Sequence, residues 1–445
     1  MCCASINSAF FPSPVLPLET RLPCSRVFVF PQGGQMARYQ PISQLTGRIM
    51  LFPLAMVLYE FATYIAHDMI QPGMLLVTAE FNVGAEWVST SLTAYLLGGV
   101  VLQWLLGPLS DKYGRRPVLL FGILFFASAC ILTTWVSDIQ QFVSLRFVQG
   151  ISLCFIGAVG YAAIQEAFEE ALAVRIMALM ANVALLAPLA GPLAGAAWLT
   201  VGSWRSMFWL FAACSAVAFL VLWRVMPETA GDRTQSVALP VLARNYGRLL
   251  KDRQVMYGSF AIGLVFIPIL TWVALSPVIL MRDEGLSRMQ YALLQLPVFL
   301  AMIAGNVTLS KVVGRMPIEQ PVKFAAWPIL LGLSLALSAT LIDAHSYLFI
   351  TAGLSLYAFG GGMVNAGLYR LTLYASDEGK GSVAAMLGMV SILTLAIGIE
   401  LAKHFYFNGG VIWFSLINFI SGVMWFGLVL MFLRERKRHA KVTPL

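Results

Sequence analysis

Apolar stretches of about 20 residues recur along most of the chain, and each is long enough to cross the ~30 Å hydrocarbon core of a bilayer as a helix. Because the bilayer core offers no water to the backbone, helices with internal hydrogen bonds are the expected form of such stretches. Their approximate limits are 50–76, 87–109, 118–136, 141–165, 173–200, 204–226, 254–280, 289–312, 322–342, 346–374, 382–406 and 410–433. We therefore expect an all-α membrane protein with about twelve transmembrane helices.

Composition excludes several other classes of protein. Charged residues make up 11% of the chain, whereas soluble domains carry about 25%. The net charge of +8 is spread over short loops, so we expect no nucleic-acid partner. The six cysteines show no paired spacing and the four histidines are scattered, so no metal site is expected. No Walker A sequence or catalytic signature is present; we expect neither a cofactor nor an enzyme.

Lys and Arg are concentrated in alternate loops, which predicts the orientation of the chain in the membrane. The side of the membrane with fewer Lys and Arg residues carries only Arg205, Arg282, Arg288 and Lys403, if the intramembrane Arg146 is set aside. Cytoplasmic loops are the ones enriched in Lys and Arg. Both termini are therefore expected to be cytoplasmic.

Two similar halves are predicted, residues 36–226 and 254–433, joined by a cytoplasmic linker at 227–253. The sequence LSDKYGRRP at 109–117 has a partner, LSKVVGRMP at 309–317, at the same point of the second half. Transporters built from repeats bind their substrate where the halves meet. Residues 434–445 are expected to form a basic tail. The Pro-rich residues 1–35 are predicted to be either a disordered extension or a misassigned start, with translation beginning at Met36.

The first apolar stretch carries two carboxylates, Glu60 and Asp68, with Tyr64 midway between them. At about 100° per residue all three fall on one broad helix face. An ionised carboxylate near the bilayer centre costs at least about 2.5 kcal/mol, so such residues face a bundle interior or a wet cavity. We expect them to line a site that binds a proton or a cation; the alternative is a buried pair satisfied by neighbouring helices.

Arg146 lies inside the fourth stretch, in SLRFVQGISLCFIG. A guanidinium there stays charged and needs partners. Glu60, Asp68 or Gln149 can supply them. A purely structural anchor is the alternative to a functional role.

The loop after the second stretch reads GPLSDKYGRRP, from Gly107 to Pro117. Gly107 allows close approach of helices and Gly114 a tight turn, while Asp111, Arg115 and Arg116 can form ion pairs that hold one face of the protein closed. Acids that can receive these cations end the fourth stretch: Glu166, Glu169 and Glu170. A loop that only sets topology is the alternative.

The fifth stretch contains ANVALLAPLAGPLAGAAW, in which Pro188, Gly191, Pro192 and Gly195 interrupt a run of small residues. Small residues let membrane helices approach closely, and proline bends them. Ordinary close packing explains this pattern as well as a functional bend does.

These segments resemble three motifs of the major facilitator superfamily. The loop at 107–117 is similar to motif A, the segment around Arg146 to motif B, and the segment with Pro188 and Gly191 to motif C of its drug/proton antiporters. The resemblance extends from about Met36 to Leu433. It implies two six-helix bundles around a central cavity, with Glu60 and Asp68 for substrates and protons, Tyr64 lining the cavity and Arg146 coupling proton binding to rearrangement.

One position departs from that pattern. Where the drug exporters that this chain resembles have Asn before the second acid, it has His67, which can titrate near neutral pH, hydrogen-bond Asp68 or simply occupy the site. The resemblance implies a monomeric, proton-coupled multidrug efflux antiporter of the bacterial inner membrane that exports lipophilic drugs. The alternatives are export of a natural metabolite or of monovalent cations for pH homeostasis, and a non-transporting membrane receptor.

Overall fold

The computed structural model describes residues 42–43, 47–230, 239–313, 315–343, 345–376 and 378–442. The predictions for residues 1–35 and for a start at Met36, and parts of those for the linker and the basic tail, fall outside the described residues. Within the described ranges the chain is helical, with two isolated bridges and no β-strand. The all-α class expected from the sequence is confirmed.

Each of the first six apolar stretches contains one helix or a short series of helices. In the fourth, a π-helical turn separates two α-helices, and in the first, a 3₁₀ turn does so. The helices of this half are α1 Leu51–Asp68, η1 Gln71–Gly73, α2 Met74–Glu80, α3 Glu86–Val101, α4 Gln103–Tyr113, α5 Arg115–Thr133, α6 Ile139–Gly150, α7 Ser152–Phe155, η2 Ile156–Gly160, α8 Tyr161–Ala167, α9 Glu170–Trp198 and α10 Trp204–Val225.

The second half follows the same plan after a helix in the linker. Its helices are α11 Leu239–Lys251, α12 Arg253–Ser276, η3 Pro277–Asp283, α13 Arg288–Val312, α14 Glu319–Phe324, α15 Ala326–Ile342, α16 Tyr347–Leu373 and α17 Lys380–Val442. Gly410 interrupts α17 with a φ of 71°, a backbone conformation that glycine adopts readily. The label α17 therefore covers two helices, which correspond to the last two expected spans and the start of the basic tail.

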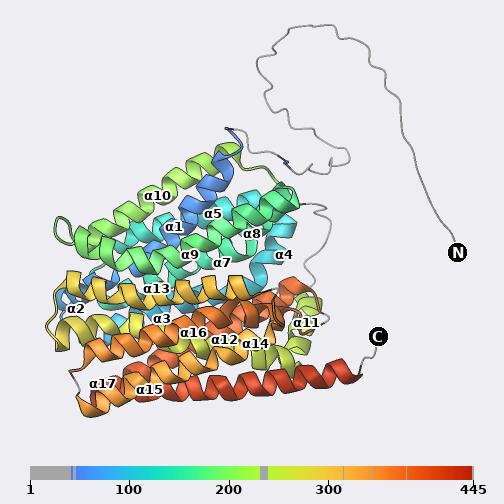
Figure 1. Ribbon diagram of the computed structural model, residues 1–445. Helices are drawn as coiled ribbons and strands as arrows, with labels where there is room; N and C mark the ends of the chain where they lie inside the picture. The colour runs from blue at the N-terminus through green and yellow to red at the C-terminus, as the bar shows by residue number, and fades with distance from the viewer. Residues whose placement is uncertain are drawn as a thin grey trace, which may run out of the picture. The chain divides into compact units, whose positions relative to one another are not determined.

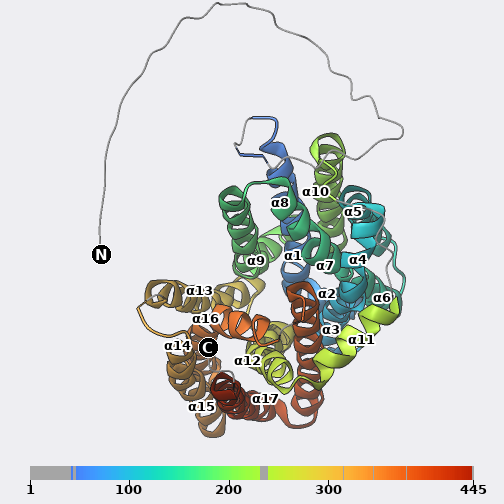
Figure 2. The same ribbon diagram turned by 90° about the vertical axis from the view of Figure 1, so that its right-hand side faces the viewer.

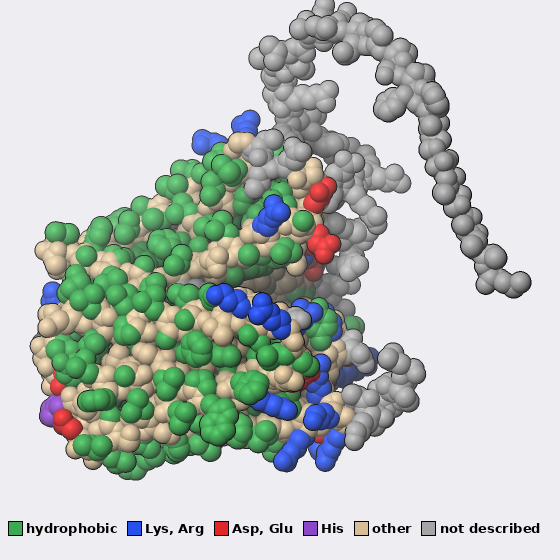
Figure 3. Space-filling view, in the orientation of Figure 1, with side chains coloured by type: hydrophobic (Ala, Val, Ile, Leu, Met, Phe, Trp, Pro, Cys, Tyr) green, Lys and Arg blue, Asp and Glu red, His purple; other side chains and the backbone are tan. Residues whose placement is uncertain are grey.

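Among the described residues, nine helices are long and apolar enough to cross a bilayer, and the pair α3 and α4, bent by 44°, forms a tenth such span. The break in α17 divides one of these helices into two spans. The helices α1, η1 and α2 together form the first span of the chain. Hydrophobic side chains cover the middle of the surface, while Lys and Arg gather toward the end where α11 and the end of α17 lie (Figure 3). This distribution fits a multi-pass membrane protein.

The helices form two groups, α1 to α10 and α12 to α17 (Figures 1 and 2). Within the second group, α12 packs against α17 and α13 against α16. The groups meet where α3 contacts α12 and α17, and where α9 contacts α13. They also meet where η1 contacts α13, where α2 contacts η3 and where α4 contacts α17.

Close approach of α3 and α6 positions the centre of the first half. A Cβ atom added to Gly150 of α6 would lie 1.9 Å from the Tyr95 carbonyl oxygen, and one added to Gly98 of α3 would lie 2.0 Å from the Phe147 carbonyl oxygen. Only glycine leaves room for this crossing. It brings the Tyr95 ring against Arg146, with 4.5 Å between the guanidinium carbon and the ring centre.

Candidate functional site

The two acids of α1 are both buried, with 0% of Glu60 and 2% of Asp68 exposed. The His67 Nδ1 atom lies 2.9 Å from Asp68 Oδ1, as the hydrogen-bond option for His67 predicts. The other carboxylate oxygen, Oδ2, has no hydrogen-bond partner among the described residues. Asp68 is thus a buried carboxylate that can still accept a proton or a hydrogen bond.

A cavity of about 190 Å³ lies between the two groups of helices. The first group lines it with Tyr64, His67, Asp68, Tyr95, Leu96, Leu153 and Pro188. The second group contributes only apolar side chains: Phe266, Ile269, Leu270, Val273, Phe299 and Met302. An acid in an apolar and aromatic wall suits lipophilic cations, because aromatic faces attract cations and the carboxylate neutralises them.

Glu60 lies two turns before Asp68 and is not among the residues that line this cavity. Its Oε1 atom accepts a hydrogen bond of 3.0 Å from the Tyr161 hydroxyl of α8, and its Oε2 atom has no hydrogen-bond partner among the described residues. Sequence reasoning did not select Tyr161. Its only signal is a hydroxyl-bearing ring within the apolar run AVGYAA.

Arg146 is fully buried, and of its predicted partners Glu60, Asp68 and Gln149 it contacts Gln149. Its Nη1 atom donates to Gln149 Oε1 at 2.7 Å and to the Ala66 carbonyl oxygen at 3.3 Å. The described residues include no ion pair from Arg146 to Glu60 or Asp68, and its Nε and Nη2 atoms have no hydrogen-bond partner there. Tyr95, whose ring lies against the guanidinium, was also missed from the sequence. Arg146 therefore contacts α1 next to the His67 and Asp68 pair.

The small residues of α9 let it pack closely against α1 at the position of Asp68. A Cβ atom added to Gly191 would lie 2.5 Å from Asp68 Cβ, and one added to Gly195 would lie 2.0 Å from the Met69 carbonyl oxygen. Pro192 is buried beside them, and Pro188 lines the cavity. The expected close packing is present, and it holds Asp68 at the cavity wall.

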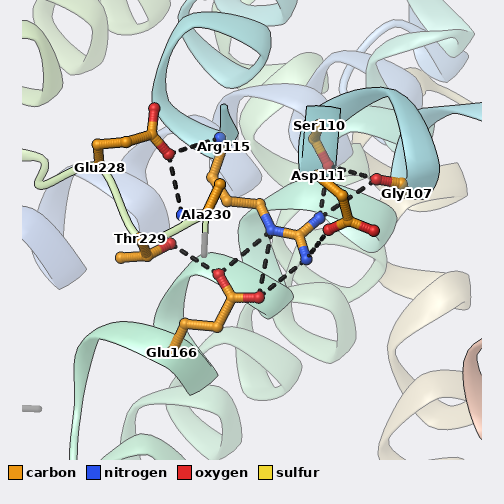
Figure 4. A network of polar contacts seen from close by, with 8 residues as sticks. All are labelled: Gly107, Ser110, Asp111, Arg115, Glu166, Glu228, Thr229 and Ala230. Atoms are coloured by element: carbon orange, nitrogen blue, oxygen red, sulfur yellow. Dashed lines mark hydrogen bonds and ion pairs between the residues drawn. The ribbon is translucent and has the colours of Figure 1, made fainter. Parts of the chain in front are cut away.

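Arg115 is the centre of a polar network where α4, α5 and α8 meet (Figure 4). Its Nη2 atom lies 2.8 Å from Glu166 Oε1, its Nη1 atom donates to Ser110 Oγ at 2.5 Å, and it forms an ion pair with Asp111. Gly114 turns the chain between α4 and α5 with a φ of 106°. The ion pair expected between this loop and the end of the fourth stretch thus involves Glu166.

The start of the linker joins the same network, which the sequence did not reveal. Glu228 Oε1 accepts a hydrogen bond of 2.8 Å from the Arg115 backbone nitrogen, and Thr229 donates one of 2.8 Å to Glu166 Oε2. Arg116 takes no part and donates instead to the Trp223 carbonyl oxygen. The network therefore ties the connection between the halves to the helices of the first half.

A polar contact also joins the two halves near Lys403 of α17. Lys403 forms an ion pair with Glu400, which lies three residues before it on the same helix face. The same ammonium group donates a hydrogen bond of 3.0 Å to Thr90 Oγ1 of α3. This contact links the second half to the first at the end opposite the Arg115 network.

Comparison with known proteins agrees with the fold and the motifs. The sequence profile of the Major Facilitator Superfamily matches residues 56–398. The chain is 54% identical over 398 residues to the "Multidrug transporter MdfA" of Yersinia pestis bv. Antiqua (strain Angola), covering 89% of this chain and 97% of that protein. It is 52% identical over 395 residues to the protein of that name from Escherichia coli O6:H1, covering 89% and 96%.

Among solved structures, a bacterial homologue of the human lysosomal transporter Spinster, inward-facing and occupied, matches with a TM-score of 0.68 at 14% identity, over 88% of this chain and 98% of that one. A match at that identity supports the fold alone. Together, the family profile, the close relatives and the paired helix groups identify the chain as a member of the major facilitator superfamily, related to the multidrug transporter MdfA.

Proposed function

We propose that this protein is a proton-coupled multidrug efflux antiporter that exports lipophilic cationic and neutral compounds by alternating access. The observation that carries the proposal is Asp68. It is a buried carboxylate with one unpartnered oxygen, in the wall of an apolar and aromatic cavity between the two halves. The printed name of the relatives, multidrug transporter, supports the same function.

In this mechanism a proton and a drug compete for the same site. Asp68 takes up a proton when the cavity opens outward. With Asp68 neutral, the protein returns to the inward-facing conformation, in which a drug displaces the proton. Cationic drugs gain from the carboxylate, while neutral drugs rely on the apolar wall. Each charge moved by the membrane potential is worth about 2.3 kcal/mol per 100 mV, which can drive export against a gradient.

The moving parts in this proposal are the two bundles, residues 36–226 and 254–433, connected by the linker at 227–253. Arg146 senses the charge state next to it through its contact with α1 at the Ala66 carbonyl. Glu60, held by Tyr161, serves as a second acid for protons or cationic drugs. The network around Arg115 holds the cytoplasmic end of the first bundle, and motif C at Pro188 and Gly191 favours export.

We further propose that the protein works as a monomer in the bacterial inner membrane, with both termini in the cytoplasm. The steep Lys and Arg asymmetry between loops supports this orientation. Bacterial sources of the relatives support the inner membrane.

The test is drug-induced proton release in energised inverted membrane vesicles, followed with a pH-sensitive dye. Ethidium, tetraphenylphosphonium and chloramphenicol are added in turn to wild type, Asp68→Ala and Asp68→Glu. We expect proton release from wild type, no release from Asp68→Ala and retained release from Asp68→Glu. The reason is that a carboxylate is required at this position, whereas the exact length of its side chain is not. Asp68→Ala that still antiports every drug with protons would contradict the role of Asp68.

Export of a natural metabolite or of monovalent cations is the second candidate. It becomes the preferred function if folded, inserted wild-type protein gives no proton release with any of the three drugs but responds to added Na⁺ or K⁺.

A further inference from the structure

The second half contains a buried polar cluster where α12 meets α13, made of Ser276, Tyr291 and Gln295. Gln295 is 1% exposed, and its Nε2 atom donates to Ser276 Oγ at 3.2 Å. Tyr291 lies one turn before Gln295 on the same face of α13 and is also buried, with 1% exposed. The remaining amide atom, Gln295 Oε1, has no hydrogen-bond partner among the described residues. One strong acceptor is therefore left over at this cluster.

The cluster adjoins the part of the cavity wall that the second half contributes, although none of its three residues is itself in the lining. On α13, Phe299 and Met302 line the cavity, and Gln295 lies one turn before Phe299 on the same helix face. On α12, Val273 lines the cavity, and Ser276 lies three residues further along. The cluster thus sits about one helical turn beyond the apolar lining contributed by the second half.

The helix that carries Tyr291 and Gln295 also contacts the first half. Helix α13 contacts both η1 and α9, the elements that follow and flank Asp68. A compound held between the halves can therefore reach Asp68 on one side and the cluster on the other.

The two sides differ in the chemistry they offer. Asp68 provides a charge, which suits a cation. The cluster carries no formal charge but presents an amide and two hydroxyl groups, which can both donate and accept hydrogen bonds. Neutral compounds gain nothing from a net charge, and burying their own amide or hydroxyl groups without partners is costly. Neutral compounds therefore need a site that offers hydrogen-bonding groups.

We propose that Ser276, Tyr291 and Gln295 form a hydrogen-bonding subsite for neutral substrates that carry amide or hydroxyl groups, with Gln295 as its main contact. This inference rests on the proposed function, because it divides the substrates of the same transport site into two classes. Cations are anchored by Asp68, and neutral compounds by Gln295. A compound that has neither a charge nor a hydrogen-bonding group binds through the apolar wall alone.

Two probes separate the classes. Tetraphenylphosphonium is a permanent cation without hydrogen-bonding groups, and chloramphenicol is neutral and carries an amide and hydroxyl groups. Binding of each is measured by equilibrium titration to purified protein in lipid nanodiscs. In Gln295→Leu we expect chloramphenicol affinity to fall about tenfold, as loss of a buried hydrogen bond predicts, and tetraphenylphosphonium affinity to stay within about twofold.

Asn418→Leu is the matched control. Asn418 is another buried amide of the second half, bonded to Thr271 Oγ1 at 2.8 Å and likewise left with one unpartnered atom, but it lies on α17 and not on the cavity-lining helix α13. Both affinities should be unchanged in it. Ser276→Ala removes a hydroxyl without adding bulk, so it tests the subsite if Gln295→Leu folds poorly; it should weaken chloramphenicol selectively as well.

Unchanged chloramphenicol affinity in both Gln295→Leu and Ser276→Ala would overturn the subsite. Equal weakening of both probes would also overturn it, since that result indicates a role in packing only. Wild type that binds tetraphenylphosphonium in competition with protons but not chloramphenicol would refute the subsite and leave the antiporter standing. Wild type that binds neither probe would refute both.

Discussion

Replacing Arg115 with lysine tests how the polar network holds α4, α5 and α8 together. Arginine reaches Glu166 through two nitrogen atoms, Nε at 3.2 Å and Nη2 at 2.8 Å, while Nη2 also pairs with Asp111 and Nη1 donates to Ser110. Lysine keeps the charge but has a single nitrogen. It cannot satisfy two carboxylates and a hydroxyl in this geometry. The substitution therefore measures the contribution of the planar, multi-donor shape of arginine while the positive charge is kept.

The magnitude follows from the exposure of the partners. The Arg115 side chain is 10% exposed, Glu166 35% and Asp111 59%. Buried hydrogen bonds to charged groups contribute about 1.5–3 kcal/mol each, but exposed ion pairs contribute only about 0.2–1 kcal/mol. The ion pair with Asp111 is of the exposed kind, and the two hydrogen bonds to Glu166 have an energy between the buried and the exposed values. We therefore expect Arg115→Lys to destabilise the protein by about 1–2 kcal/mol.

The assay is thermal unfolding of the purified protein in mild detergent, with Arg116→Lys as the matched control. Arg116 is the next residue, carries the same charge and, within the described part of the chain, donates to the Trp223 carbonyl oxygen in an exposed contact. Its replacement should cost less than about 0.5 kcal/mol, whereas Arg115→Lys should lower the midpoint by a few degrees. Equal midpoints for the two variants would show that the network adds no stability beyond the positive charge of the loop.

Two further predictions concern packing and pH. Gly195→Ala places a Cβ atom 2.0 Å from a backbone oxygen of the first span, so it should cost about 1–3 kcal/mol, while Gly157→Ala, with nothing within 4 Å, should leave the unfolding midpoint unchanged. Glu80 lies past the first apolar stretch; burial alone would raise its pKa, but hydrogen bonds from Arg205 and Trp204 outweigh burial and lower it. This group therefore stabilises the fold above the pKa of the unfolded chain, about 4.3, and the stability advantage of wild type over Glu80→Gln should be present at pH 7 and vanish as the pH falls through the folded-state pKa.

The parts of the site that lie on one helix could be predicted from the sequence, because helical periodicity determines them. Glu60, Tyr64 and Asp68 share a face of α1 by spacing alone, and the contact between His67 and Asp68 joins neighbours in the chain. The ion pair between Glu400 and Lys403 follows from their spacing in the same way. Span limits were predictable for a related reason, since bilayer thickness sets the length of each apolar stretch.

Contacts between distant segments could not be predicted. Tyr161 donates to Glu60 from 101 residues away, and the Tyr95 ring reaches Arg146 because Gly98 and Gly150 let two helices cross closely. A single sequence indicates that Arg146 needs partners but not which of several polar groups it meets. The structure selects Gln149 and a backbone carbonyl rather than either acid.

This choice of partners bears on how protonation can be coupled to motion. If Arg146 were paired directly with Asp68, a proton arriving at Asp68 would leave the guanidinium as an uncompensated buried charge, at a large cost. In the structure Arg146 instead holds the Ala66 carbonyl, two residues before Asp68, and rests on the Tyr95 ring. Its partners keep their charge state when Asp68 gains or loses a proton. The proposed coupling through Arg146 therefore depends on the long-range attraction between the two groups, because no hydrogen bond in the described residues joins Arg146 to Asp68.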